Sequence, residues 1–386
     1  MNKILILSQD DEYIRKIDRK APKGRFEFFQ CTNVEKAYEI IDQVNIDIVI
    51  VDDDNQGVAL KKIKEKNRQI IRISVSELTA SIEHYMPKDV QQAQLQCNKN
   101  CTPEELFILI DKVLEIEAKV KNKDLINLMS TLKHLPTVPK IYHQMTEMIQ
   151  HNASVEEIAN KLEEDPAITS NILKLANTAF YNAKTASIRQ AIMYIGLINV
   201  KNIILSNAVF GDDGLDPKTR ELHWEHVRLT NRILGAIYQD ILKKKLNNNI
   251  SSVGLLHDIG SVVLMSNFPK EFGEIAKRVN EDPKLMFHDL ESELLGFNHE
   301  ELGGYLLDLW GLPYPVIEAA LCHHEPMDEG IINQELVKAV HLANHYAWQA
   351  MDHIKHDTHL NTDVFTSMGI TQEAFETYFE TLRKKL

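Results

Sequence analysis

A histidine and an aspartate stand side by side at His257 and Asp258, behind the apolar pair Leu255–Leu256. An imidazole nitrogen and a carboxylate oxygen can bind one divalent ion together, and imidazoles from facing helices can complete a mononuclear or dinuclear site. Twelve of the sixteen histidines fall in residues 223–359. Those that could join the pair are His226, His299, His323 and His324. A lone histidine of this kind is more often a hydrogen-bonded core residue, but five together favour a metal site.

Composition limits the classes of protein that could carry this cluster. The 386 residues suit two or three domains, and the apolar (44%) and charged (26%) fractions are those of a soluble globular protein. A net charge of −13 without a Lys/Arg-rich run argues against a nucleic-acid surface. The four cysteines form no C-x-x-C pair, and no apolar run reaches membrane-spanning length. We therefore expect a cytoplasmic protein whose partners are proteins or small ligands, with no nucleic acid and no membrane.

The first hundred residues contain short apolar runs, which are typical of strands covered on both faces. Between these runs, apolar residues recur at helical spacing. The runs are Ile4–Leu7, Phe26–Phe29, Ile48–Val51, Ile70–Ile71 and Leu95–Cys97. This order predicts a five-stranded α/β domain over residues 1–101. Ligands bind at the carboxyl ends of strands in such sheets, where Ser8, Asp52 and Ser74 are expected.

This segment resembles the receiver domain of response regulators, in which an aspartate that ends the third strand accepts a phosphoryl group. The resemblance implies that Asp52 is the phosphoacceptor, Ser74 the switch hydroxyl and Lys99 the lysine of the fifth strand. The alternative interpretation is that Asp52–Asp54 only cap the junction between a strand and a loop.

The sequence departs from receivers where they bind Mg²⁺, at an acidic pair after the first strand. Ser8 and Gln9 stand there, and Asp10–Asp11 follow two residues later. A hard octahedral ion needs carboxylates at fixed positions to bridge it to a phosphate. We therefore expect a degenerate receiver that binds Mg²⁺ poorly, unless a rearranged loop brings Asp10 to the site.

A long connecting helix is predicted over residues 102–130. Thr102 and Glu105 form a capping box around Pro103, which suits the first helical position. Apolar side chains then follow 3-4 spacing for about two heptads: Leu106, Leu109, Val113, Ile116 and Val120. The first turns should pack on the sheet, and the later turns could pair two chains in a homodimer.

The remaining sequence is predicted to be all-α, with helix starts at Ser154–Glu157 and Asp165–Pro166. Over roughly residues 131–350 it resembles the HDOD family, with an N-terminal helical subdomain at 131–212 and an HD-like subdomain with a terminal helix at 220–386. The residues that carry the resemblance are Glu164–Ala167, Leu173–Ala179, Ser187–Ile188, Trp224, Leu255–Gly260, His299–Gly303, Trp310–Pro313 and His323–His324.

HDOD proteins are all-α signalling modules related to HD-type metal phosphohydrolases, generally without demonstrated hydrolase activity and often joined to receivers. The resemblance implies metal ligands at His226, His257, Asp258, His299, His323, His324 and Asn344. The amide of Asn344 can coordinate an ion but brings no charge. Ser261 stands where enzymes that cleave cyclic dinucleotides have a lysine, and no Gly-Tyr-Pro loop follows His323–His324.

Two hypotheses of different class follow. The favoured one is a non-enzymatic signal-output protein, in which an HDOD domain passes a conformational change to another signalling protein. The alternative is a metal-dependent phosphohydrolase that acts on a cyclic dinucleotide such as cyclic di-GMP or on a nucleotide, and binding of a nucleotide without cleavage also stays open. No catalytic residue is assigned. We expect His226, His257, Asp258 and at least one later histidine to face a common cavity, with weak or partial metal binding.

Overall fold

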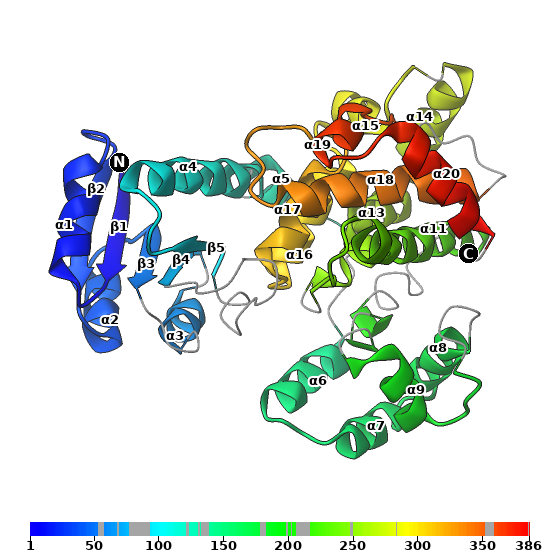
Figure 1. Ribbon diagram of the computed structural model, residues 1–386, viewed down its shortest axis with the longest axis horizontal. Coiled ribbons are helices and arrows are strands. Elements are labelled where there is room, and N and C mark those ends of the chain that lie inside the picture. The colour runs from blue at the N-terminus through cyan, green and yellow to red at the C-terminus, as the bar shows by residue number, and fades with distance from the viewer. Residues whose placement is uncertain are drawn as a thin grey trace. The chain divides into compact units, whose positions relative to one another are not determined.

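The computed structural model describes residues 1–52, 58–67, 69–76, 93–120, 123–129, 132, 139–177, 183–197, 200–201, 203–205, 217–247, 250–282, 284–351, 359–384 and 386. They form two compact units, residues 1–119 with 312–314, and residues 120–311 with 315–386 (Figure 1). Asp53–Asp54 and Thr178–Ala179, which were named in the sequence analysis, lie outside the described residues.

The first unit contains a five-stranded parallel sheet in the order β2-β1-β3-β4-β5 (Figure 1). The strands are β1 (Asn2–Leu7), β2 (Phe26–Cys31), β3 (Ile48–Asp52), β4 (Ile71–Ser76) and β5 (Leu95–Asn98). The helices are α1 (Asp11–Lys20), α2 (Val34–Gln43), α3 (Val58–Lys66) and α4 (Pro103–Val120). The predicted five-stranded α/β domain is confirmed.

Helices cover both faces of this sheet, which explains why its strands are continuous apolar runs. On one face, Leu5 packs in a cluster with Ala37 of α2 and Leu60 of α3. On the other face, Phe107 of α4 stacks on Phe26 of β2, with ring centroids 5.3 Å apart.

Helix α4 begins at the predicted capping box. The Glu105 carboxylate accepts the Thr102 backbone N–H at 2.8 Å, and the Thr102 hydroxyl accepts the Glu105 N–H at 3.3 Å. The apolar face that suggested a seam between two chains is buried within one chain, because Leu106, Val113 and Ile116 are at most 4% exposed. Pairing of two chains through this helix stays a prediction.

The second unit is helical in its described residues. Its first helices are α5 (Lys123–Met129), α6 (Lys140–Gln150), α7 (Val155–Glu163), α8 (Pro166–Ala176) and α9 (Ile188–Ile195). Both predicted helix starts are present: Ser154 and Glu157 form the capping box of α7, and Asp165 Oδ1 accepts the N–H of Ile168 in α8. In the described parts of the chain, every helix is too short or too polar to cross a membrane.

The helices that hold the histidine cluster follow. They are α11 (Pro217–Ala236), the π-helix η3 (Ile237–Ile241), α12 (Val253–Leu256), α13 (Ile259–Asn267), α14 (Pro269–Glu281), α15 (Phe287–Leu295), α16 (His299–Leu309), α17 (Tyr314–Cys322), α18 (Gln334–Ala350), α19 (Asp363–Ser367) and α20 (Gln372–Arg383). Helix α11 packs against α18, and α13 packs against α16.

The contact between α13 and α16 is very close because both helices carry glycine where they meet. A Cβ atom added to Gly260 would lie 1.9 Å from the carbonyl oxygen of His299 and 2.8 Å from the backbone nitrogen of Gly303. Asp258 immediately precedes α13, and His299 begins α16. The missing side chain at position 260 therefore allows these two candidate ligands to come together.

Candidate metal centre

Six of the predicted ligands form two groups in the helical unit. One group is His226, His257 and Asp258, and the other is His299, His323 and His324. Within each group, one ligand atom from every residue lies within 4.8 Å of the others. The residues come from α11, the junction of α12 and α13, the start of α16 and the segment after α17, so elements distant in sequence converge.

The first group is closed off from solvent, and in the second group only His324 is partly exposed. His226, His257 and His323 have no exposed surface, and His299 and Asp258 are 3% and 8% exposed. Buried imidazoles and carboxylates need polar partners, because an unpartnered polar group in a protein interior is costly. The hydrogen-bond partners of each histidine ring therefore determine which of its nitrogens can bind an ion.

Two of the rings are held in the tautomer that a metal ligand needs. Nδ1 of His257 lies 3.1 Å from the carbonyl oxygen of Gly254, and Nδ1 of His323 lies 2.9 Å from that of Ala320. A carbonyl can only accept, so Nδ1 carries the proton and Nε2 of the neutral ring keeps its lone pair. Burial lowers the pKa of both histidines. Nε2 of His323 is buried with no hydrogen-bond partner among the described residues, which suits a nitrogen that binds an ion.

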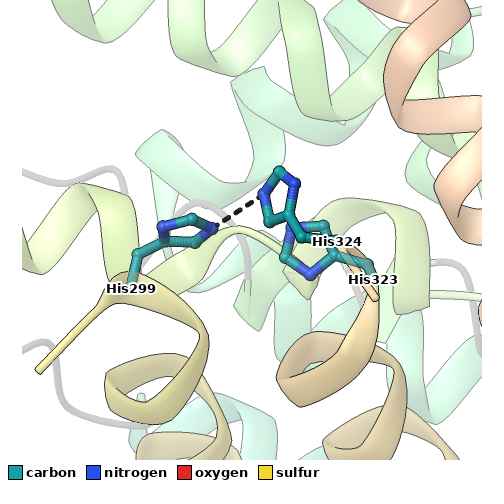
Figure 2. A group of neighbouring side chains, drawn as sticks. All are labelled: His299, His323 and His324. Carbon is teal, nitrogen blue, oxygen red and sulfur yellow. Dashed lines mark hydrogen bonds between the residues drawn. The ribbon is translucent and has the colours of Figure 1, made fainter. Parts of the chain in front are cut away.

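The second group presents two nitrogens at the spacing of ligands to one ion. Figure 2 shows His299 at the start of α16 facing His324, and their Nε2 atoms lie 3.1 Å apart. Two imidazole nitrogens that bind one tetrahedral ion at about 2.1 Å are about 3.4 Å apart, which is close to the spacing of this hydrogen-bonded pair. The ring of His323 lies beside that of His324, with centroids 4.2 Å apart.

Glu291 of α15 fixes the ring of His299 from behind. Its Oε2 accepts from Nδ1 of His299 at 2.6 Å and from the backbone N–H of His299 at 2.8 Å. Burial disfavours a charge on His299, but Glu291 and Asp258 outweigh it and raise the His299 pKa to about 10. A carboxylate behind an imidazole orients the ring and increases its basicity as a ligand. Sequence reasoning did not identify Glu291.

Asp258 belongs to the first group and also approaches the second. Its Oδ1 accepts the Ser261 hydroxyl at 2.5 Å and lies 3.8 Å from Nε2 of His299, while its Oδ2 lies 3.2 Å from Nε2 of His223. Burial works against the charged form, but His223 and His299 hold the Asp258 pKa well below its usual value. Sequence reasoning also missed His223, although it precedes His226 by three residues and so shares a face of α11 with it.

The last predicted ligand, Asn344, is also brought to the cluster. It is buried on α18, and its side chain interacts with the ring of His257. Nearby His341 has a different role, because its Nδ1 donates to the carbonyl of His323 at 2.7 Å and its Nε2 accepts the N–H of Asn361 at 3.0 Å. Asp258 is therefore the one carboxylate among the seven predicted ligands.

The predicted receiver residues meet only in part. Asp52 ends β3, where its Oδ2 accepts the Ser8 hydroxyl at 2.6 Å and its Oδ1 lies 3.2 Å from Nζ of Lys99. Asp10, which a rearranged loop could have brought to the site, instead caps α1 by accepting the N–H groups of Glu12 and Tyr13 at 3.0 Å each.

Ser74 is not brought to Asp52. It is in register with Val51, and strand alternation directs its side chain to the sheet face opposite that of Asp52. Ser76, the last residue of β4, is the hydroxyl residue nearer the carboxyl edge. Sequence spacing could not distinguish the two, because a shift of two residues in register preserves the apolar pattern.

We expect negligible Mg²⁺-dependent labelling of Asp52 by a small phosphodonor such as acetyl phosphate. Among the described residues, the groups that contact its carboxylate are a hydroxyl and an ammonium, and neither supplies the further carboxylate that a bridging Mg²⁺ needs. Intact-protein mass spectrometry after incubation with the donor measures the phosphorylated fraction. Stable labelling in the wild type that is absent from Asp52→Asn would contradict this prediction.

Comparisons with known proteins indicate the family to which part of the chain belongs. Residues 135–326 match the family model of the HDOD domain. The structure of an HDOD domain protein of unknown function from Geobacter sulfurreducens is 29% identical, with a TM-score of 0.51 over 61% of this chain and 79% of that one.

More distant structures share the fold. A candidate signal transduction protein from Marinobacter aquaeolei VT8 is 17% identical, with a TM-score of 0.53 over 84% of this chain and 81% of that one. A candidate phosphohydrolase from Shewanella amazonensis SB2B is 19% identical, with a TM-score of 0.52 over 67% of this chain and 94% of that one.

A curated but uncharacterized protein of Treponema pallidum (strain Nichols) is 22% identical over 241 residues, which are 61% of this chain. The chain spans 46% of that relative's length. Residues 135–326 therefore form an HDOD domain, which follows an N-terminal five-stranded parallel α/β domain of receiver-like fold.

Proposed function

We propose that this is a signal-output protein whose HDOD domain is a non-catalytic interaction or ligand-sensing module built around a closed metal centre. The observation that carries this proposal is the burial of five of the six grouped ligands, since His226, His257 and His323 have no exposed surface and only His324 is partly exposed. Catalytic metal centres keep a position open for water and substrate, whereas structural centres are closed by protein ligands.

The chemistry of the ligands suits an ion of intermediate softness. Five imidazoles and one carboxylate favour zinc, iron or nickel over the oxygen-seeking Mg²⁺ and Ca²⁺. Such an ion would be held by His226, His257 and Asp258, or by the three later histidines. Once bound it would compensate the charge of Asp258 and fasten α11, α13 and α16 to one another. The neutral Asn344 gives no further compensation, so we expect weak or partial occupancy.

The partners that this proposal implies are other signalling proteins in the cytoplasm. A net charge of −13 favours a protein or a small ligand over nucleic acid. A nucleotide or cyclic dinucleotide could be sensed by the HDOD domain without being cleaved.

The second candidate function is a metal-dependent phosphohydrolase that acts on a cyclic dinucleotide or a nucleotide. The position of Asp258, which belongs to the first ligand group and approaches the second, favours it, because two-metal hydrolases clamp the attacking and leaving oxygens between neighbouring ions. The closed site and the single carboxylate favour the first proposal.

Metal content and turnover of the full-length protein separate the two functions. After loading with manganese, iron or zinc, we expect partial metal occupancy that is lost in His257→Ala and Asp258→Ala and kept in His345→Ala. His345 is the matched control, since it lies on α18 outside both groups. We expect no hydrolysis of cyclic di-GMP or nucleotides above the level of the two ligand variants. Robust hydrolysis that His257→Ala abolishes without unfolding the protein would establish the enzyme instead.

A further inference from the structure

The two carboxylate oxygens of Asp52 face different groups of its own chain, since one accepts a hydrogen bond and the other lies at ion-pair distance from an ammonium. Ser8 donates its hydroxyl to Oδ2 at 2.6 Å, and the Lys99 ammonium lies 3.2 Å from Oδ1. The Ser8 oxygen in turn accepts the backbone N–H of Asp10 at 3.0 Å, which directs the hydroxyl proton toward Asp52. The Asp52 side chain is 4% exposed, so these contacts are screened little by water.

This arrangement does not fit the Mg²⁺ ion of a receiver. A cation at Asp52 would need further carboxylate ligands around it, but the residue beside Asp52 at the end of β1 is the neutral Ser8. The nearby Asp10 carboxylate is used to cap α1. Asp11 and Glu35 also line the pocket of ≈810 Å³ beside Asp52, but both are exposed.

We propose that Ser8 and Lys99 take the place of the divalent ion at this edge of the sheet, and that residue 8 determines the metal independence of the domain. Ser8 donates a hydrogen bond to one oxygen of Asp52 and the Lys99 ammonium offsets its charge, so the carboxylate needs no metal to be stable in this position. The domain is then held in one state by its own side chains, and signals that act on it do so without metal-assisted phosphorylation.

The sheet register explains why position 8 is decisive. Leu7 of β1 pairs with Val51 of β3, so Ser8 and Asp52 follow them side by side at the ends of parallel neighbouring strands. A carboxylate at position 8 would lie next to that of Asp52. Two carboxylates sharing one site repel each other, and a divalent cation with oxygen ligands relieves the repulsion.

The test compares four full-length proteins: wild type, Ser8→Asp, the uncharged control Ser8→Asn, and Ser8→Asp combined with Asp52→Asn. Calorimetric titration with MgCl₂ and the thermal unfolding midpoint measure the response to the ion. We expect Ser8→Asp alone to bind Mg²⁺ and to gain stability from it. The HDOD domain is identical in all four proteins, so its own metal binding cancels in the comparison.

Two results would overturn the proposal: a wild type that binds Mg²⁺ as tightly as Ser8→Asp does, or a folded Ser8→Asp protein that does not respond to Mg²⁺. If Ser8→Asp does not fold, a double-mutant cycle with Ser8→Ala and Asp52→Asn takes its place. The double variant should then lose less stability than the sum of the losses in the two single variants. Additive losses would refute the contact between Ser8 and Asp52.

Discussion

Replacing Gly260 with alanine should lower the free energy of unfolding of the helical unit by at least about 4 kcal/mol. The new Cβ would lie 1.9 Å from the carbonyl oxygen of His299, and the obstructing atoms are backbone, not the end of a flexible side chain. The clash can be relieved only by moving α13 away from α16. That movement would also separate Asp258 from His299, so we expect metal binding to be lost in any protein that still folds.

Gly273→Ala is the matched control for this change. Gly273 lies within α14, and a Cβ atom there would meet no atom within 4 Å. Alanine should therefore raise stability by up to about 1 kcal/mol through helix propensity. Urea unfolding followed by tryptophan fluorescence reports on the helical unit alone, because all three tryptophans, Trp224, Trp310 and Trp348, belong to it. Equal unfolding midpoints for the two variants would contradict the tight crossing of α13 and α16.

Much of the fold could be predicted because its signals are local. Continuous apolar runs such as Ile48–Val51 indicate strands buried on both faces, and the parallel sheet contains all five of them. The capping box of Thr102 and Glu105 marks the start of α4 in the same way. The role of the apolar stripe on α4 could not be predicted, because spacing alone does not reveal whether the chain itself buries Val113 and Ile116.

The candidate site was predictable only where residue type carried the signal. Histidines are rare enough that an ordered set of them identifies the two ligand groups. Glu291 has no such signal, because the same helix carries two other acidic residues, Asp289 and Glu293, which are exposed. Only the packing of the helix distinguishes Glu291, which it buries against His299. The resemblance that suggested the ligands likewise says nothing of His223, which reaches Asp258 because α11 lies beside the α12–α13 junction.

Glu291→Gln should weaken metal binding by roughly 10–100-fold, the usual effect of removing a partner behind a metal-binding histidine. Glutamine keeps the size of the side chain and one acceptor oxygen, so the backbone N–H of His299 can stay bonded. It loses the negative charge that makes the His299 ring a stronger ligand. The affinity for Zn²⁺, measured by competition with a fluorescent chelator, should fall while the helical content stays unchanged.

Glu293→Gln removes the same charge from the same helix but should leave the affinity for Zn²⁺ unaltered. The Glu293 side chain is 58% exposed and pairs with Arg278 at the surface, at 3.1 Å, and exposed pairs contribute at most about 1 kcal/mol. A loss of affinity in both variants would point to the overall charge of α15 and not to a contact with His299. Wild-type affinity in Glu291→Gln would mean that the ion, if bound, does not use His299, and would leave His226, His257 and Asp258 as its ligands. The two variants together therefore distinguish which of the ligand groups holds the metal.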